Sequence, residues 1–260
     1  MKNVITIMLL LVAVFANAQS GSTTNIGPEG AWANVVSATV LNDKMYTIEK
    51  NGRIYETDLT TTMRTPLGKQ DFDKGKFIFS ANNMLYVIDY EGTMFKVDAT
   101  TGVKEQVGIR ATWSQTYAYT ICKDQFYAVN SLGALSVTDL KTNTTREMGT
   151  TYVNVSNMFA TADKVYLLEQ SGKLQEMNPL NGAQKMISAN GVWGGILCGT
   201  GYNGGVYMID KIGNLYSLGT TAGTKSKMGK TEFSLARFLL GANGNLYFIE
   251  STGSLYEIKM

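Results

Sequence analysis

The chain has 260 residues, of which 44% are hydrophobic, so it is long enough to bury a sizeable core. Its formal net charge is only +2 and it carries no long run of like charges, which argues against a nucleic-acid partner. It contains no histidine, which excludes histidine-based catalytic pairs and histidine metal clusters, and we expect neither catalysis nor a cofactor.

Residues 1–18 have the composition of a secretory signal peptide. Lys2 supplies a positive charge, the stretch from Val4 to Phe15 is almost entirely apolar, and Ala16-Asn17-Ala18 is a small-residue cleavage site. The apolar stretch is too short to span a membrane, and no second long one follows. We therefore expect residues 19–260 to form a single domain that is periplasmic or secreted, soluble after processing and without a membrane span.

Residues after the signal peptide repeat one pattern six times. A tyrosine in an apolar strand is followed three positions later by an acidic or amide residue, and three positions after that by a glycine. The tyrosines are 39 to 41 residues apart, at Tyr46, Tyr86, Tyr127, Tyr166, Tyr207 and Tyr247. The glycines keep the same spacing, at Gly52, Gly92, Gly133, Gly172, Gly213 and Gly253. A constant period near 40 residues in β-rich units is typical of β-propeller blades.

Each copy predicts four strands joined by tight turns, which we name A to D in chain order. In the second copy they cover Lys76 to Ala81, Met84 to Asp89, Thr93 to Asp98 and Val103 to Gly108. Pairs such as Asn42-Asp43 between strands A and B tolerate the positive φ of two-residue hairpins. Strand B is apolar on both faces, so each sheet must lie between two neighbours. The sequence therefore predicts an all-β, six-bladed β-propeller with four antiparallel strands per blade.

The ring is expected to close through its N-terminal end. The sixth copy has no strand D before Met260, whereas Thr24-Asn25-Ile26-Gly27 matches the strand D pattern and precedes the first strand A. We therefore predict that residues near Thr23 to Gly27 pair with Ser254 to Lys259 and complete the last blade.

The two cysteines, Cys122 and Cys198, fall on equivalent strands of copies three and five. Stacked sheets lie about 10 Å apart, and two such steps exceed the Cα separation of about 4.4–6.8 Å that a disulfide requires. We expect two buried free thiols. A catalytic thiol would lack its base, because the chain has no histidine.

An acidic or amide residue ends strand B in every copy, and the repeat places all six on one rim of the disc. Two interpretations remain open. The favoured one is the first position of a turn, where such side chains accept backbone N–H bonds, and the other is a site for a cation or a basic partner. The six residues are Glu49, Asp89, Asn130, Glu169, Asp210 and Glu250.

A second ring is aromatic and follows each strand D on the same rim. Its members are Trp32, Phe72, Trp113, Tyr152, Trp193 and Phe233. They could pack between blades, or form exposed platforms on a binding face. We expect a mixed outcome, with Trp32 and Trp193 partly exposed beside the small residues Gly30, Gly191 and Gly194, and with the other four aromatic side chains buried.

Three glycines, Gly199, Gly201 and Gly204, match a dinucleotide-binding fingerprint literally. We predict no nucleotide site there, because a hairpin turn and a strand follow instead of a helix.

The segment from Phe238 to Tyr247, FLLGANGNLY, carries the repeat best, and with the following Gly-x-Leu-Tyr it resembles the tectonin and tachylectin-type propeller lectins. The resemblance extends weakly over all six units. It implies a propeller fold and lectin activity. Tachylectin-type propellers have five blades and this chain predicts six, so no ligand position is carried over.

The sequence therefore predicts an exported, non-enzymatic propeller that binds through one face. The first hypothesis is a protein-interaction subunit, with its protein partner in an outer-membrane or secretion assembly of the cell envelope. The alternative is a lectin for envelope or environmental glycans. The third hypothesis is an enzyme that uses rim carboxylates with a metal ion.

Overall fold

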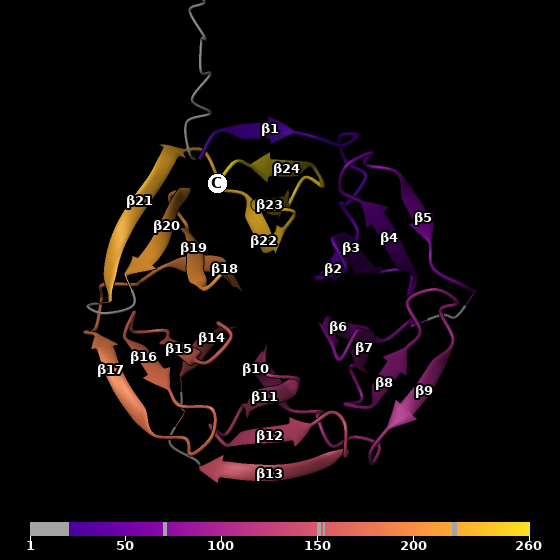
Figure 1. Cartoon of the computed structure of the whole chain (residues 1–260), viewed down its shortest axis with the longest axis horizontal. Coiled ribbons are helices and arrows are strands. Elements are labelled where there is room, and N and C mark those ends of the chain that lie inside the picture. The colour runs from indigo at the N-terminus through magenta and orange to yellow at the C-terminus, as the bar shows by residue number, and fades with distance from the viewer. Residues whose placement is uncertain (1–20, 70–71, 150–151, 153, 220–222) are drawn as a thin grey trace, which may run out of the picture.

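The computed structural model describes residues 21–69, 72–149, 152, 154–219 and 223–260. These residues form six four-stranded antiparallel sheets arranged radially around a central axis (Figure 1). The predicted all-β, six-bladed propeller is confirmed. The predicted signal peptide, residues 1–18, lies outside the described residues. Across the described ranges, no helix has the length and hydrophobicity needed to cross a membrane.

Strand A lies nearest the axis in each blade and strand D lies at the periphery (Figure 1). The bounds, in the order A to D, are as follows: blade 1, β2 (Val35–Leu41), β3 (Lys44–Glu49), β4 (Ile54–Asp58), β5 (Arg64–Pro66); blade 2, β6 (Gly75–Ala81), β7 (Met84–Asp89), β8 (Met94–Val97), β9 (Lys104–Val107); blade 3, β10 (Thr116–Cys122), β11 (Gln125–Asn130), β12 (Leu135–Asp139), β13 (Thr144–Gly149); blade 4, β14 (Val155–Ala160), β15 (Val165–Glu169), β16 (Leu174–Met177), β17 (Gln184–Ser188); blade 5, β18 (Ile196–Tyr202), β19 (Gly205–Asp210), β20 (Asn214–Gly219), β21 (Thr224–Thr231); blade 6, β22 (Ala236–Ala242), β23 (Asn245–Glu250), β24 (Leu255–Ile258), β1 (Thr23–Asn25).

The A–B connections are two-residue turns, as their amide and glycine residues predict. Asn42 and Asp43 have φ values of 50° and 60°, the positive values that a type I′ turn requires. The last two residues of the glycine-rich segment behave the same way, with φ of 47° at Asn203 and 76° at Gly204. They join β18 to β19 in a hairpin, so the dinucleotide fingerprint has no structural counterpart.

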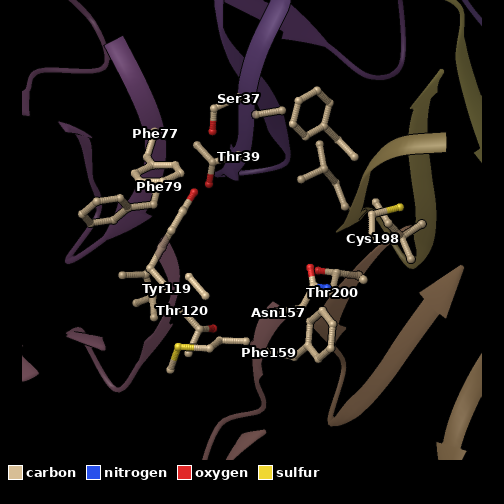
Figure 2. A pocket seen from close by; sticks show the side chains of 18 of the residues that line it. Ser37, Thr39, Phe77, Phe79, Tyr119, Thr120, Asn157, Phe159, Cys198 and Thr200 are labelled. Carbon is tan, nitrogen blue, oxygen red and sulfur yellow. The ribbon is translucent and has the colours of Figure 1, made fainter. Parts of the chain in front are cut away.

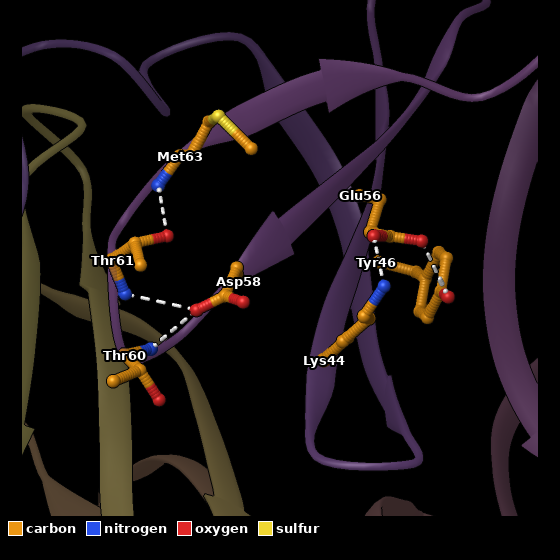
Figure 3. A network of polar contacts seen from close by, with 7 residues as sticks. All are labelled: Lys44, Tyr46, Glu56, Asp58, Thr60, Thr61 and Met63. Atoms are coloured by element: carbon orange, nitrogen blue, oxygen red, sulfur yellow. Dashed lines mark hydrogen bonds and ion pairs between the residues drawn. The ribbon is translucent and has the colours of Figure 1, made fainter.

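In blades 1, 2 and 3 an aspartate side chain holds the C–D turn by accepting backbone N–H bonds. Asp58 Oδ1 accepts hydrogen bonds from the backbone N–H groups of Thr60 and Thr61, each 2.9 Å long (Figure 3). Asp98 and Asp139 make the same pair of bonds in the next two blades. These turns lie on the same side of the disc as the A–B turns, because strands C and A run in the same direction in an antiparallel blade.

Carboxylates on strand C tie the strands together beside these turns. Glu56 accepts hydrogen bonds from Lys44 at 2.5 Å and from the Tyr46 hydroxyl at 2.9 Å (Figure 3). In blade 6, Glu257 accepts one from the lead tyrosine Tyr247 at 3.1 Å. The tyrosine ring packs in the blade gap while its hydroxyl group keeps a polar partner.

The opposite side of the disc carries the B–C turns and the loops that lead from each strand D to the next strand A. We call it the loop face. Backbone hydrogen bonds join turn to loop within a blade, as from Tyr90 N to Lys74 O (2.7 Å) and from Ser251 N to Leu235 O (2.9 Å). The B–C turns of this face are residues 50–53, 90–93, 131–134, 170–173, 211–213 and 251–254.

Every inner strand carries a β-bulge at its second residue, where it enters from the loop face. A bulge leaves one residue without a partner on the neighbouring strand and redirects its side chain. The six bulge residues all line the central channel, and they are Val36, Lys76, Tyr117, Ser156, Leu197 and Arg237.

Hydrophobic clusters of described residues fill the gaps between neighbouring blades, and each contains one member of the predicted aromatic ring. Tryptophan occupies every second gap, and phenylalanine or tyrosine occupies the others. The inner strands lie closer together at the gaps without tryptophan, which are β2–β6, β10–β14 and β18–β22. The larger tryptophan side chains thus lie in the wider gaps. The closed ring of six blades therefore has approximate threefold symmetry.

The last blade closes as predicted. Strand β1 pairs antiparallel with β24, with Thr23 opposite Ile258 and Asn25 opposite Tyr256 (Figure 1). Ile26 N also donates to Leu255 O at 3.0 Å. The two cysteines are free and buried, which confirms the prediction that no disulfide joins them.

Removing β1 should destabilise the ring. A chain that begins at Gly27 loses the β1–β24 hydrogen bonds, each contributing roughly 0.5–1.5 kcal/mol, and leaves β24 as an open edge. We expect a free energy of unfolding about 2–4 kcal/mol lower than that of a chain beginning at Gly21, measured by urea denaturation. Equal stability of the two chains would show that β1 does not hold the ring closed.

Candidate functional site

The aromatic ring is buried throughout. Trp32 is 0% exposed and Trp193 is 1% exposed, and the other four members are also buried. The expectation that these two tryptophans expose their ring edges is wrong. Their side chains enter the blade gaps, where the Trp193 indole donates to Gly223 O at 3.1 Å. Buried rings offer no platform to a ligand, so we withdraw the aromatic face as a candidate site.

The glycine that precedes several of these aromatics makes room for the ring. A Cβ atom on Gly27 would lie 2.2 Å from the Trp32 ring, and one on Gly108 would lie 3.1 Å from the Trp113 ring. The glycine-plus-aromatic motif therefore serves blade packing at these positions.

The acidic residues of the loop face are engaged by their own turns and neighbours. Asp89 accepts the backbone N–H of Thr93 at 2.8 Å, and Glu169 contacts Lys173 at 3.0 Å. Glu49 is buried and ion-paired with Arg64, whereas Glu250 accepts from the Thr252 hydroxyl at 3.2 Å. Within the described ranges, no three His, Cys, Asp or Glu side chains gather in a way that could hold a metal ion.

In blade 5 the acidic residue that ends strand B is Asp210, which accepts several hydrogen bonds from the turn that follows it. Its Oδ1 accepts hydrogen bonds from the backbone N–H groups of Ile212, Gly213 and Asn214 at 2.9–3.0 Å. Burial acts to raise the pKa of Asp210, but these bonds and the Asn214 side-chain amide outweigh it and lower the pKa. Asn130 accepts two equivalent bonds in blade 3 without a charge. The need for a hydrogen-bond acceptor at the B–C turn therefore explains why an acidic or amide residue ends strand B.

A central channel of about 500 Å³ is the main cavity that the inner strands enclose. The hydroxyl groups of Ser37, Thr39 and Tyr119 lie on one side of it, and Asn157 and Thr200 lie on the facing side (Figure 2). Burial raises the pKa of Tyr119 to about 12, so its hydroxyl stays protonated at neutral pH. The wall thus offers neutral hydrogen-bonding groups, which sequence analysis did not single out.

Aromatic rings fill the wall between these polar groups. Phe79 stacks on Phe126 with ring centroids 4.8 Å apart, and Phe77 contacts Tyr119 at 4.7 Å. On the facing wall, Gly201 lets the blade 5 strand approach its neighbour, because a Cβ there would lie 1.6 Å from Ala160 O. Aromatic side chains thus line the channel on blades 2, 3, 4 and 6, whereas blade 5 contributes Leu197, Cys198 and Thr200.

Two cations stand at the channel mouth on the loop face. Lys76 and Arg237 are bulge residues of blades 2 and 6, and both are half-buried. They are the charged members of the set of side chains that line the channel. In the sequence, each of these residues is a charged residue at the second position of a largely apolar inner strand. The repeat alignment alone did not show that this position lines the channel.

Exposed apolar side chains concentrate on the loop face. Ile109, Leu132 and Ile212 are 80%, 73% and 66% exposed. The loop-face set among the described residues is Tyr90, Ile109, Tyr117, Leu132, Val192, Leu197, Ile212 and Leu235. The other exposed large hydrophobic residues are Met63, Val103, Leu180, Met186 and Met260. Sequence analysis missed this set, because the repeat does not keep one residue type at the turn, loop and bulge positions that these residues occupy.

Removing a buried tryptophan should affect stability. We expect Trp193→Ala to lower the free energy of unfolding by about 3–5 kcal/mol, because it leaves a cavity in the gap between blades 4 and 5. The exposed neighbour Val192 provides the control, and Val192→Ala should change stability by less than about 0.5 kcal/mol in the same urea titration. A loss below about 1 kcal/mol for Trp193→Ala would contradict a packing role.

The turn carboxylate should be replaceable by an amide. Asp210→Asn should keep stability within about 1 kcal/mol at pH 7, whereas Asp210→Ala should lose about 1–3 kcal/mol. The pKa of Asp210 is lowered on folding, so its charge stabilises the fold above the ordinary carboxyl pKa. The difference between the native chain and Asp210→Asn should therefore shrink as the pH falls through the lowered pKa of Asp210. A difference that is flat between pH 7 and pH 2 would contradict this account.

Comparisons with known proteins agree with the architecture. No family model matches the chain, and no curated protein resembles it in sequence. BamB from Moraxella catarrhalis is similar in structure, with a TM-score of 0.58 at 14% identity, over 87% of this chain and 85% of that one. Virginiamycin B lyase from Staphylococcus aureus has a TM-score of 0.63 at 9% identity, over 92% and 98%.

A third similar structure is PorZ of Porphyromonas gingivalis, described as an essential bacterial surface component of the type-IX secretion system. Its TM-score is 0.56 at 13% identity, and the match covers 90% of this chain and 33% of PorZ. At these identities the likeness shows the fold alone. The resemblance to tectonin and tachylectin-type lectins stays a prediction from sequence.

Proposed function

We propose that the chain is an exported, non-enzymatic protein-interaction module of the cell envelope that docks a partner protein through its loop face. The single observation that carries this proposal is the set of exposed apolar side chains on that face. Exposed apolar residues that gather on one surface are typical of protein interaction sites.

The apolar residues form two arcs. Tyr90, Ile109, Tyr117 and Leu132 belong to blades 2 and 3 and the loop between them. The remaining four belong to blade 5 and to the loops that precede and follow it. The B–C turns of blades 1, 4 and 6 are polar instead, with the sequences KNGR, QSGK and STGS. This mixture of apolar and polar segments matches the composition of non-obligate protein interfaces.

Charged groups border the first arc. Glu91 forms ion pairs with both Lys74 and Arg110, beside Tyr90 and Ile109. These ion pairs are exposed and contribute little to stability. At the edge of an interface, such pairs set the orientation of a partner and its rate of association.

Two further observations support an envelope setting. The N-terminal residues have the composition of an export signal. PorZ, one of the proteins with a similar fold, is a surface component of a secretion system. The absence of histidine from the sequence excludes histidine-based catalytic pairs.

The alternative function, glycan binding, has one observation in its favour. A hollow of about 440 Å³ lies between blades 6 and 1, lined by polar residues that include Thr60, Asn243 and Glu257. Hydroxyl, amide and carboxylate groups are the partners that sugar hydroxyls use. Binding of the purified chain to a glycan array, lost in Asn243→Ala but kept in loop-face variants, would support a lectin instead.

Photo-crosslinking in the native host tests the docking face. A photoreactive residue at Leu132 or Ile212 should give one discrete adduct with an envelope protein, and the same residue at Val103 or Leu180 should not. The double variant Leu132→Glu/Ile212→Glu should reduce co-purification of that protein at least tenfold, since buried charges oppose docking. The matched control Val103→Glu/Leu180→Glu should leave it unchanged. Equal adducts from both faces, or from neither, would contradict the proposal.

A further inference from the structure

We propose that the loop-face mouth of the central channel is a carboxylate-binding site formed by Lys76 and Arg237. The site goes beyond the proposed docking function, since it needs no partner protein to exist.

The bulges bring both cations to the mouth. In each blade the second residue of the inner strand is pushed out of the ladder, and Lys76 and Arg237 occupy this position on β6 and β22. Blade 1 lies between them, and its bulge residue is the short Val36. Positions 76 and 237 therefore lie on either side of position 36 at the rim of one cavity, and the Lys76 side chain reaches toward Thr116 of blade 3.

The Lys76 ammonium group is held in place by one hydrogen bond and one aromatic contact, which leave some of its hydrogen-bond donors available. Its ammonium group donates to Thr116 O at 2.6 Å and lies 4.7 Å from the centre of the Phe77 ring. An ammonium group has three donors, so this backbone bond leaves donors for a ligand. Burial lowers the pKa of Lys76, and no carboxylate near it acts in the opposite direction.

Arg237 is positioned by an aromatic ring. Its guanidinium group lies 5.2 Å from the centre of the Phe238 ring, a contact that orients the planar group while its N–H edge stays available. In the part of the chain that the structure describes, Arg237 forms no ion pair. A guanidinium group with a fixed orientation is suited to two-point recognition of a carboxylate.

The channel has a positive charge that its walls do not balance. None of the described side chains that line it is acidic, so Lys76 and Arg237 give it a formal charge of +2. A charged cleft with low-dielectric walls focuses the field and raises the local concentration of ions of opposite sign. Half-buried cations without a counter-ion are unfavourable for folding, and an anionic ligand would offset that cost.

The interior favours an organic anion over inorganic phosphate. Beyond the mouth, the hydroxyl groups of Ser37 and Thr39 and the Asn157 amide face the cavity between aromatic side chains (Figure 2). Phosphate sites in proteins commonly use consecutive backbone N–H groups at a helix start or a nest. In the extended inner strands, alternate N–H groups point to opposite sides, with one set paired to strand B, so consecutive N–H groups do not converge on the channel. The carboxylate could belong to a free small acid or to the C-terminus of a docked protein segment.

Calorimetric titration of the full chain tests the site. The probes are citrate, the pentapeptide GGSGG with a free C-terminus, its C-terminal amide, and inorganic phosphate. We expect saturable binding of citrate or of the free-acid peptide. Binding should weaken at least tenfold in Lys76→Gln/Arg237→Gln, because each charged hydrogen bond contributes a factor of about ten or more. Citrate binding alone would identify a free acid as the source, and selective binding of the free-acid peptide would identify a protein terminus.

The matched control is Lys50→Gln/Lys211→Gln. It removes the same charge from exposed lysines of the same face that do not line the channel, and it should change affinity less than about twofold. If losing the Lys76 bond to Thr116 O impairs folding, Arg237→Gln alone retains the test. No saturable binding of citrate or peptide, equal losses in the two double variants, or tighter binding of phosphate would overturn the proposal. The loop-face variant Leu132→Glu/Ile212→Glu should still bind citrate, which separates this site from the docking function.

Discussion

Burial of both faces of every blade is the constraint on which this structure depends. A sheet whose strand B is apolar on both sides cannot stand at the end of a stack, because one apolar face would then be exposed to water. A closed ring is the arrangement that gives every sheet two neighbours. The gap aromatics, the glycines that make room for their rings and the pairing of β1 with β24 all serve this closure. The inner and outer surfaces of the ring are then available for other roles.

The fold could be predicted because its determinants recur. Tyr46 and Gly52 have counterparts every 39 to 41 residues, so the pattern that predicts each strand and turn occurs six times in the sequence. The closure followed from the same logic, since Thr24 to Gly27 supplies a strand that the sixth copy lacks. The free thiols followed as well, because a whole blade separates Cys122 from Cys198. Repetition turns weak local preferences into a consistent signal.

The candidate sites were harder to predict for the opposite reason. The candidate residues of the loop face and of the channel mouth depart from the repeat, whereas the alignment identifies what recurs. Trp32 and Trp193 recur, and they turned out to be packing residues. Lys76 and Ile212 have no counterparts of the same type in most copies, so the alignment gave them no weight. Whether a side chain at a bulge points into the channel depends on how six strands meet around an axis, which no single copy encodes.

The threefold alternation of the gap aromatics has a consequence for how the ring can be observed. Trp32, Trp113 and Trp193 are the chain's three tryptophans, and each is buried in a different gap, at blades 6–1, 2–3 and 4–5. Tryptophan fluorescence, excited selectively, therefore samples every second gap and does not report directly on the other three. A variant that keeps one tryptophan and replaces the other two with phenylalanine, the residue that fills two of the remaining gaps, turns the ring into a spectroscopic reporter of one chosen interface.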